Sequence, residues 1–68
     1  MELTLKACRV NVKASIKETA DYVGVSGASV RNWENGSHVP SIVHAQKLVA
    51  FFNSRGFNIS VNDINFLP

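Results

Sequence analysis

Residues 15–40 read SIKETADYVGVSGASVRNWENGSHVP, and this stretch decides the fold. Ser15-Ile16-Lys17-Glu18 is a capping box, in which the serine hydroxyl and the glutamate carboxylate each accept the other residue's backbone N–H and so start a helix. Gly24 ends this helix, because glycine readily adopts the left-handed conformation of a helix C-terminus. Ser26 can cap a second helix, which Asn35-Gly36 ends. Two helices joined by a short turn that contains glycine form a helix-turn-helix.

Apolar residues at helical spacing predict three further helices, and with them an all-α, compact five-helix bundle. The first helix runs from about Leu3 to Asn11, and the fourth runs from Ser41 to near Asn53. A second capping-box pattern at Ser60 predicts a brief final helix, although the alternation of residues 57, 59 and 61 also fits a short strand. The inward-facing residues predicted from this spacing are Leu5, Cys8, Val12, Ile16, Ala20, Val23, Val30, Trp33, Ile42, Ala45, Leu48, Val49 and Phe52.

Length and composition restrict the function. The 68 residues make a single domain, residues 1–68, with one core. One cysteine, Cys8, excludes an internal disulfide and a four-cysteine zinc site, and His38 and His44 lack the spacing of a helical zinc pair. No nucleophile–base pair or group of convergent carboxylates is present, so we expect neither an enzyme nor a bound metal or cofactor. The net charge of +2 permits binding to nucleic acid without requiring it.

The chain also lacks signals that would direct it into or across a membrane. Its longest apolar run, residues 48–52, is far shorter than the roughly 20 residues of a membrane span. The first residues do not have the basic and then apolar layout of a signal peptide. We therefore expect a cytoplasmic protein that makes no contact with a membrane.

The stretch from Ser15 to Pro40 resembles the Cro/C1-type, or Xre-like, helix-turn-helix family of phage-repressor-like regulators. Ala20 matches the small residue of the family's second helix, and Gly24 matches its turn glycine. Trp33-Glu34-Asn35-Gly36 resembles the aromatic-Glu-x-Gly ending of its third helix, in which Val30 is the apolar residue. The resemblance implies a lambda-repressor-like fold and a sequence-specific DNA-binding transcriptional regulator of a bacterial or phage genetic switch. It also implies that Arg9 pairs with Glu34.

In DNA-binding members of the family the start of the third helix enters the major groove. Carried over to this sequence, the base-facing residues are Ser26, Gly27, Ala28, Arg31 and Asn32. The phosphate-facing residues are Ser15, Lys17, Ser29, Asn35, Ser37 and His38. The implied partner is a double-stranded DNA operator, bound by a homodimer that sets two recognition helices about 34 Å apart. The candidate dimer surface consists of Phe51, Phe57, Ile59, Phe66 and Leu67.

The sequence departs from the family pattern where DNA would be read. Ile16 stands where the family usually has a glutamine that binds phosphate, and Thr19 stands at a customary apolar position. Gly27 and Ala28 cannot hydrogen-bond base edges, although Ala28 could touch a thymine methyl. Base reading would then rest on Asn32 at an adenine and on Arg31 at a guanine or a phosphate.

This sparse set of polar groups leaves a second function open. An exposed Ile16 beside Gly27 and Ala28 would form a small, smooth patch suited to another protein's helix. The chain would then be an antirepressor or modulator that uses its helix-turn-helix surface to bind a repressor protein.

Overall fold

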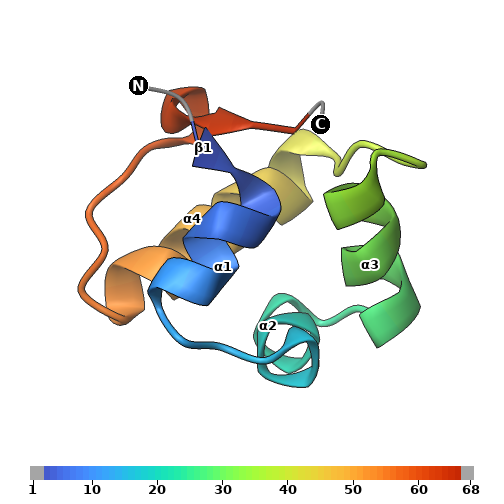
Figure 1. The fold of residues 1–68 in the computed structure, drawn as a ribbon, viewed down its shortest axis with the longest axis horizontal. Helices are drawn as coiled ribbons and strands as arrows, with labels where there is room; N and C mark the ends of the chain where they lie inside the picture. The colour runs from blue at the N-terminus through green and yellow to red at the C-terminus, as the bar shows by residue number, and fades with distance from the viewer. Residues whose placement is uncertain (1–2, 67–68) are drawn as a thin grey trace.

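The computed structural model describes residues 3–66 as four α-helices, one 3₁₀ turn and a small two-stranded sheet (Figure 1). In chain order the elements are β1 (Leu3–Thr4), α1 (Leu5–Asn11), α2 (Ile16–Val23), α3 (Gly27–Asn35), α4 (Ile42–Ser54), η1 (Val61–Asp63) and β2 (Ile64–Asn65). The all-α class is confirmed, because the strands of this part of the chain have two residues each. The described residues hold four α-helices rather than five, since the predicted final helix is the single 3₁₀ turn η1.

Each of the four α-helices begins at a hydroxyl side chain that accepts a first-turn backbone N–H. The accepting and donating residues are Thr4 and Ala7 (3.1 Å), Ser15 and Glu18 (3.0 Å), Ser26 and Ser29 (3.2 Å), and Ser41 and His44 (3.2 Å). The capping box at Ser15 is complete, because Glu18 Oε1 accepts the Ser15 N–H at 3.0 Å. Gly24 and Gly36 end α2 and α3 with φ of 87° and 83°. α2 and α3 therefore lie between the serine and glycine cap residues that the sequence indicated.

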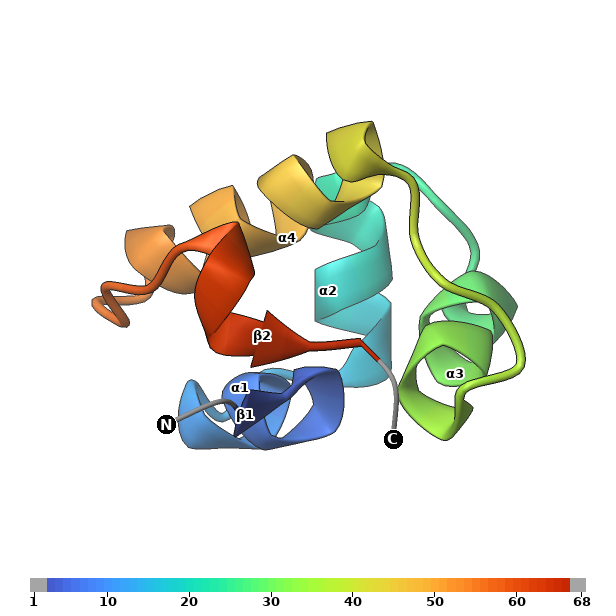
Figure 2. The ribbon, with the colours of Figure 1, turned by 90° about the horizontal axis from the view of Figure 1, so that it is seen from above.

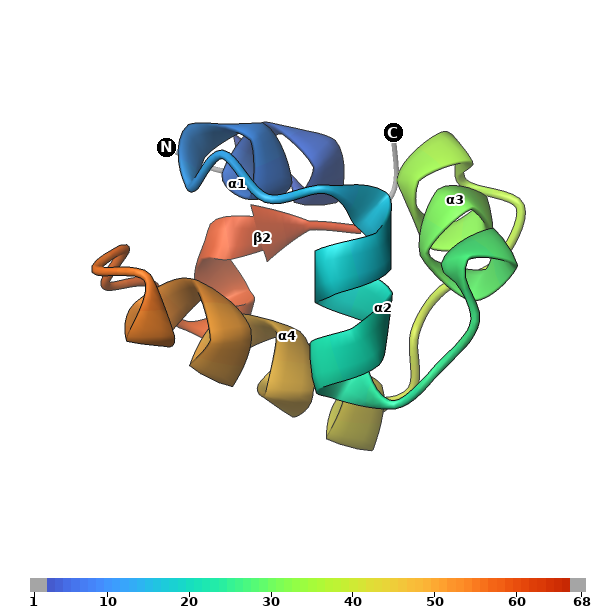
Figure 3. The ribbon, with the colours of Figure 1, turned by 90° about the horizontal axis from the view of Figure 1, so that it is seen from below.

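The core lies where α2 packs against its two neighbours. Figures 2 and 3 show α2 between α4 and α3, and α1 lies across the remaining side next to the sheet. The largest fully buried side chains are Phe52, Leu48, Val23, Val30, Thr19 and Cys8. Cys8 is a buried free thiol, as predicted, and burial raises the pKa of this thiol. A raised pKa keeps the sulfur in its unreactive protonated form.

The described members of the predicted dimer surface in the C-terminal half are buried or partly buried. Phe51 is buried, because the Tyr22 ring and the Arg55 guanidinium each lie 5.1 Å from its ring centroid. The other described members of that surface, residues 57, 59 and 66, pack partly buried against the core, and Leu67 lies outside the described residues. Conversely, Ile42 was expected in the core and is 63% exposed, because the core side of α4 starts one turn later at Ala45.

The two ends of the described chain meet in the sheet. β1 and β2 run parallel, with Leu3 opposite Ile64 and Thr4 opposite Asn65 (Figure 1). The first helix was expected to begin near Leu3 and begins instead at Leu5, because Leu3 and Thr4 are extended and paired with β2. Residues 57–60 form neither the predicted strand nor a helix. Ile64 then contributes a buried side chain to the core beside α1.

Candidate nucleic-acid interface

The turn between α2 and α3 is fixed by backbone hydrogen bonds. The N–H groups of Gly24 and Val25 both donate to Ala20 O, at 2.8 and 3.0 Å. Ala20 is buried in the core on α2, so a larger side chain there would overpack its surroundings. Thr19, the unexpected polar residue before it, is completely buried, and its hydroxyl donates to Ser15 O at 2.9 Å. The threonine is tolerated because a backbone carbonyl of its own helix satisfies its hydroxyl.

α3 turns one side to the core and the other outward. Val30 and Trp33 are buried, and at roughly 100° per residue Ala28, Arg31 and Asn35 fall on the opposite side, where all three are exposed. Asn32 lies at the border of this outer face and is partly buried. The outer face of α3, defined by Ala28, Arg31 and Asn35, therefore presents two polar side chains and one methyl group.

The structure places the five predicted base-facing residues on α3 or at its cap, in different settings. Ser26 is the N-cap, and its hydroxyl accepts the Ser29 N–H and lies 3.2 Å from the Ser29 hydroxyl. Both hydroxyls are therefore engaged with each other. Gly27 is partly buried on the side of α3 that meets α2, and Arg31 lies one turn further along that side. Arg31 is the one member with an exposed cationic side chain.

The predicted phosphate-facing residues lie in three places: Ser15 and Lys17 at the start of α2, Ser29 and Asn35 within α3, and Ser37 and His38 in the loop after it. Ser15 uses its hydroxyl and its amide in the capping box, and the backbone N–H groups of Ile16 and Lys17 have no acceptor within the helix. The Lys17 amine bonds Asp21 at 2.8 Å, and this hydrogen bond raises the pKa of Lys17. The backbone N–H groups of Ile16 and Lys17, together with the exposed Lys17 amine, make the N-terminus of α2 suited to binding an anion.

In the loop after α3, Asn35 Oδ1 accepts the Ser37 N–H at 2.9 Å, and the His38 N–H donates to Asn32 O at 3.3 Å. The side chains of Ser37 and His38 are exposed. Asn35 belongs to the outer face of α3, and it lines the same surface depression as Arg31.

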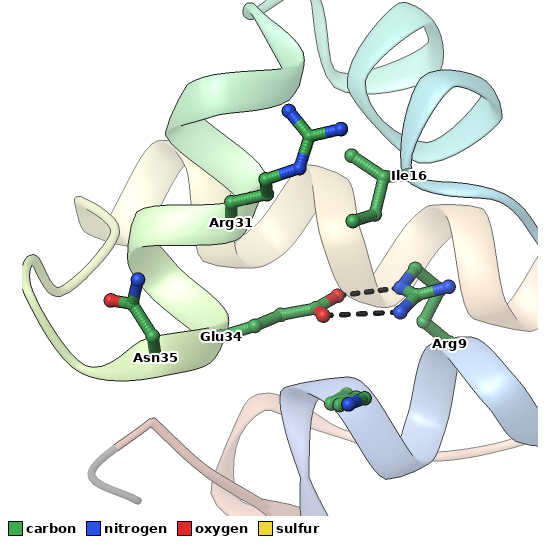
Figure 4. A pocket seen from close by; sticks show the side chains of 6 residues that line it. Arg9, Ile16, Arg31, Glu34 and Asn35 are labelled. Atoms are coloured by element: carbon green, nitrogen blue, oxygen red, sulfur yellow. Dashed lines mark hydrogen bonds and ion pairs between the residues drawn. The ribbon is translucent and has the colours of Figure 1, made fainter.

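An open depression of about 310 Å³ lies where α1, the start of α2 and α3 come together (Figure 4). Its lining residues are Lys6, Arg9, Ile16, Arg31, Glu34 and Asn35. Arg9 and Glu34 pair at its base through two hydrogen bonds, of 2.6 and 3.1 Å, so their charges cancel. Lys6 and Arg31 have no carboxylate partner among the described residues, so the depression carries net positive charge.

Sequence reasoning missed Lys6 as a member of this site. Lys6 and Arg9 are three residues apart on α1, a spacing that places both on one side of a helix. Because Arg9 was already predicted to reach α3, this spacing was the signal that could have placed Lys6 there too. Ile16 was predicted to face inward on its helix and, in the alternative function, to form part of an exposed patch. It is partly buried, because it packs against the core.

Two further observations concern metal ligands and helix length among the described residues. They contain no group of three or more histidine, cysteine, aspartate or glutamate side chains that could hold a metal ion. Within the same residues, none of the helices has the length and apolar character that crossing a membrane requires.

Comparison with known proteins agrees with this geometry. A family model described as helix-turn-helix matches residues 5–57, which include all four α-helices. Neither the curated proteins nor the solved structures yield a match to the chain.

Proposed function

Because this chain belongs to the Cro/C1-type helix-turn-helix family, we propose that it is a sequence-specific regulator that binds operator DNA in a bacterial or phage genetic switch. The observation that carries the proposal is the position of Arg31. Its guanidinium is exposed on the outer face of α3, has no carboxylate partner among the described residues, and lies beside the start of α2. An unpaired guanidinium on a recognition helix suits a guanine edge or a phosphate.

The proposed complex divides the surface into two sets of contacts. α3 would lie in the major groove, with Arg31 donating two hydrogen bonds to guanine and Asn32 pairing with adenine. The amides of Ile16 and Lys17, with Ser37 and His38 on the other side of α3, would hold phosphates and set the angle of the helix. Lys6 on α1 adds a positive charge to the surface depression that Arg31 also lines.

The test is binding of the purified protein to duplexes enriched from a random-sequence DNA pool, measured by fluorescence anisotropy and footprinting. We expect a defined footprint and an affinity that falls steeply with salt, because counterion release supplies much of the binding free energy. Asn32→Ala should lose roughly 1–3 kcal/mol, concentrated at one adenine. Arg31→Lys keeps the charge and loses the planar double donor, so it should relax base preference more than it lowers overall affinity. Lys47→Ala, which removes an exposed cation on α4, is the matched control and should change little.

The second candidate function is binding to a repressor protein, and the same assay separates it. What favours it is the scarcity of polar groups at Ile16, Gly27 and Ala28, although the partial burial of Ile16 reduces the apolar area that a partner could cover. In that case the protein alone would bind DNA only weakly, on the order of 10⁻⁴–10⁻⁶ M and without sequence preference. It would form a stable complex with a repressor encoded near it, and Ile16→Glu would disrupt that complex by placing a charge in an apolar contact.

A further inference from the structure

The glycine at the start of α3 is not explained by the fold. Gly27 has an ordinary helical conformation, since the positive φ values among the glycines belong to residues 24, 36 and 56. A Cβ atom built on Gly27 would lie 3.5 Å from Ile16 Cγ2 and 3.9 Å from Arg31 Nη1, which is normal contact distance. Neither the backbone nor the packing therefore requires glycine at position 27. Glycine is also among the least stabilising residues in a helix, so its presence there calls for another explanation.

The missing side chain leaves a recess with one apolar wall and one cationic wall. The γ2 methyl of Ile16 and the guanidinium of Arg31 both lie within 4 Å of the Cβ position that Gly27 lacks. Figure 4 shows these two side chains approaching each other from α2 and α3 at the edge of the depression. Ile16 offers no hydrogen bond, so this wall suits an apolar group, whereas Arg31 suits a pair of acceptors.

In the major groove this combination matches one arrangement of bases. Guanine presents the acceptors N7 and O6, which an arginine fork binds, and thymine presents a methyl group at C5. A methyl group next to a bound guanine would enter the recess, contact Ile16 and lie against the flat guanidinium. Building on the proposed DNA-binding function, we propose that Ile16, Gly27 and Arg31 together read the 5-methyl group of a pyrimidine that neighbours a guanine. Thymine and 5-methylcytosine both carry this methyl group.

The experiment uses the purified protein and the best duplex from the random-pool selection. Each thymine is replaced singly by deoxyuridine, which removes one methyl group and leaves base pairing intact. We expect about a fourfold loss of affinity at one thymine of the bound site, which corresponds to one buried methyl group. That thymine should lie next to one particular guanine. In Arg31→Ala, replacing this guanine by another base should no longer change the affinity. The thymine–adenine pair at this position is then replaced by cytosine–guanine and, separately, by 5-methylcytosine–guanine. If 5-methylcytosine restores the affinity that cytosine loses, either thymine or 5-methylcytosine can supply the methyl group.

Two variants test the recess itself. Gly27→Ala fills it with a methyl group and should abolish the difference between thymine and uracil, while helix propensity keeps the domain at least as stable. Ile16→Ala removes the apolar wall and should reduce the same difference, whereas Ile42→Ala, an equal truncation at an exposed position, should not. A thymine–uracil difference that survives in Gly27→Ala would overturn the inference.

The outcomes also separate this inference from the function on which it rests. A selected duplex that binds tightly, depends on Arg31 and ignores every thymine-to-uracil change would reject methyl reading and leave DNA binding intact. If the selection enriches no duplex at all, both the DNA-binding proposal and this inference are wrong.

Discussion

Arg9 of α1 and Glu34 of α3 form a forked ion pair that joins the first helix to the end of the recognition helix. Arg9 Nε donates to Glu34 Oε2 at 2.6 Å, and Arg9 Nη2 donates to Oε1 at 3.1 Å. Arg9 Nη1 also donates to Ala14 O at 2.9 Å, so one guanidinium connects α1, the following loop and α3. The two side chains are 13% and 8% exposed, which makes this a largely desolvated pair.

We expect Arg9→Ala and Glu34→Ala each to destabilise the domain severely, by about 3–5 kcal/mol, because each leaves a buried charge without its partner. The double variant should lose less than the sum, since it removes both charges. Urea denaturation followed by circular dichroism gives the four free energies of unfolding. Losses that simply add would show that the two groups do not interact in solution.

The Lys17–Asp21 pair serves as the control for this cycle. Its N–O distance is 2.8 Å, similar to that of the buried pair, but its side chains are 84% and 65% exposed. Exposed pairs contribute little, because water and salt screen them. Its coupling should therefore be much smaller than that of Arg9 and Glu34 and should fall further at high salt.

Trp33→Ala should leave the domain largely unfolded. Trp33 is buried on the inner face of α3 with its ring 5.3 Å from that of His44, and emptying such a site costs about 3–5 kcal/mol. A domain of this size has little more stability than that to lose. Tyr22→Ala, which deletes a half-exposed aromatic residue from α2, should cost clearly less. A thermal melt of Trp33→Ala that matches the wild type would contradict the structure at the centre of the family motif.

Thr19→Val should be close to neutral, within about 1 kcal/mol of the wild type. The Thr19 hydroxyl is buried and bonds Ser15 O, but this carbonyl also accepts the Thr19 backbone N–H at 3.1 Å. Valine therefore removes a polar group without leaving the carbonyl unpaired. Thr19→Ala, which leaves a cavity, should cost more. If valine proved as damaging as alanine in urea denaturation, the hydroxyl itself would be required.

Stability should fall as the pH drops from about 5 to about 2. The backbone N–H of Ser15, then the Arg55 guanidinium and the Ser15 hydroxyl, lower the pKa of Glu18 from 4.5 to about 2. A folded-state pKa below the unfolded value adds stability above the unfolded pKa, and this is lost as the carboxylate is protonated. Glu18→Gln should flatten the dependence of the urea midpoint on pH across this interval. Some slope should remain, because hydrogen bonds from Ser60 also lower the pKa of Asp63.

The parts of the fold that the sequence predicts correctly depend on signals only a few residues long. The cap at Ser15 and the turn at Gly24 act within one helical turn, so the limits of α2 could be derived without tertiary information. The pairing of Leu3 with Ile64 joins opposite ends of the described chain through strands of two residues, which are too short to show a periodic pattern. Ile42 has the correct helical phase for the core, but the buried side of α4 begins only at Ala45.

The candidate site likewise has a part that the sequence predicts and a part that it does not. The resemblance to the family locates α3 and the partners Arg9 and Glu34, because these follow from position in a motif. The recess at Gly27 could not be predicted, since its walls come from two helices and depend on the direction of both side chains. Sequence alone placed Ile16 both on the inner side of its helix and in an exposed patch, and the structure shows that packing against the core buries part of it.

The pairing of β1 with β2 joins the two ends of the described chain. Leu3 cannot meet its backbone partner until Ile64 is in place, and nearly the whole described chain separates the two. Closing so long a loop is entropically unfavourable until the helices inside it have packed. The side of α1 that receives Ile64 is therefore covered by a segment from the opposite end of the described chain. The fold of the described residues is complete only when β1 and β2 have paired.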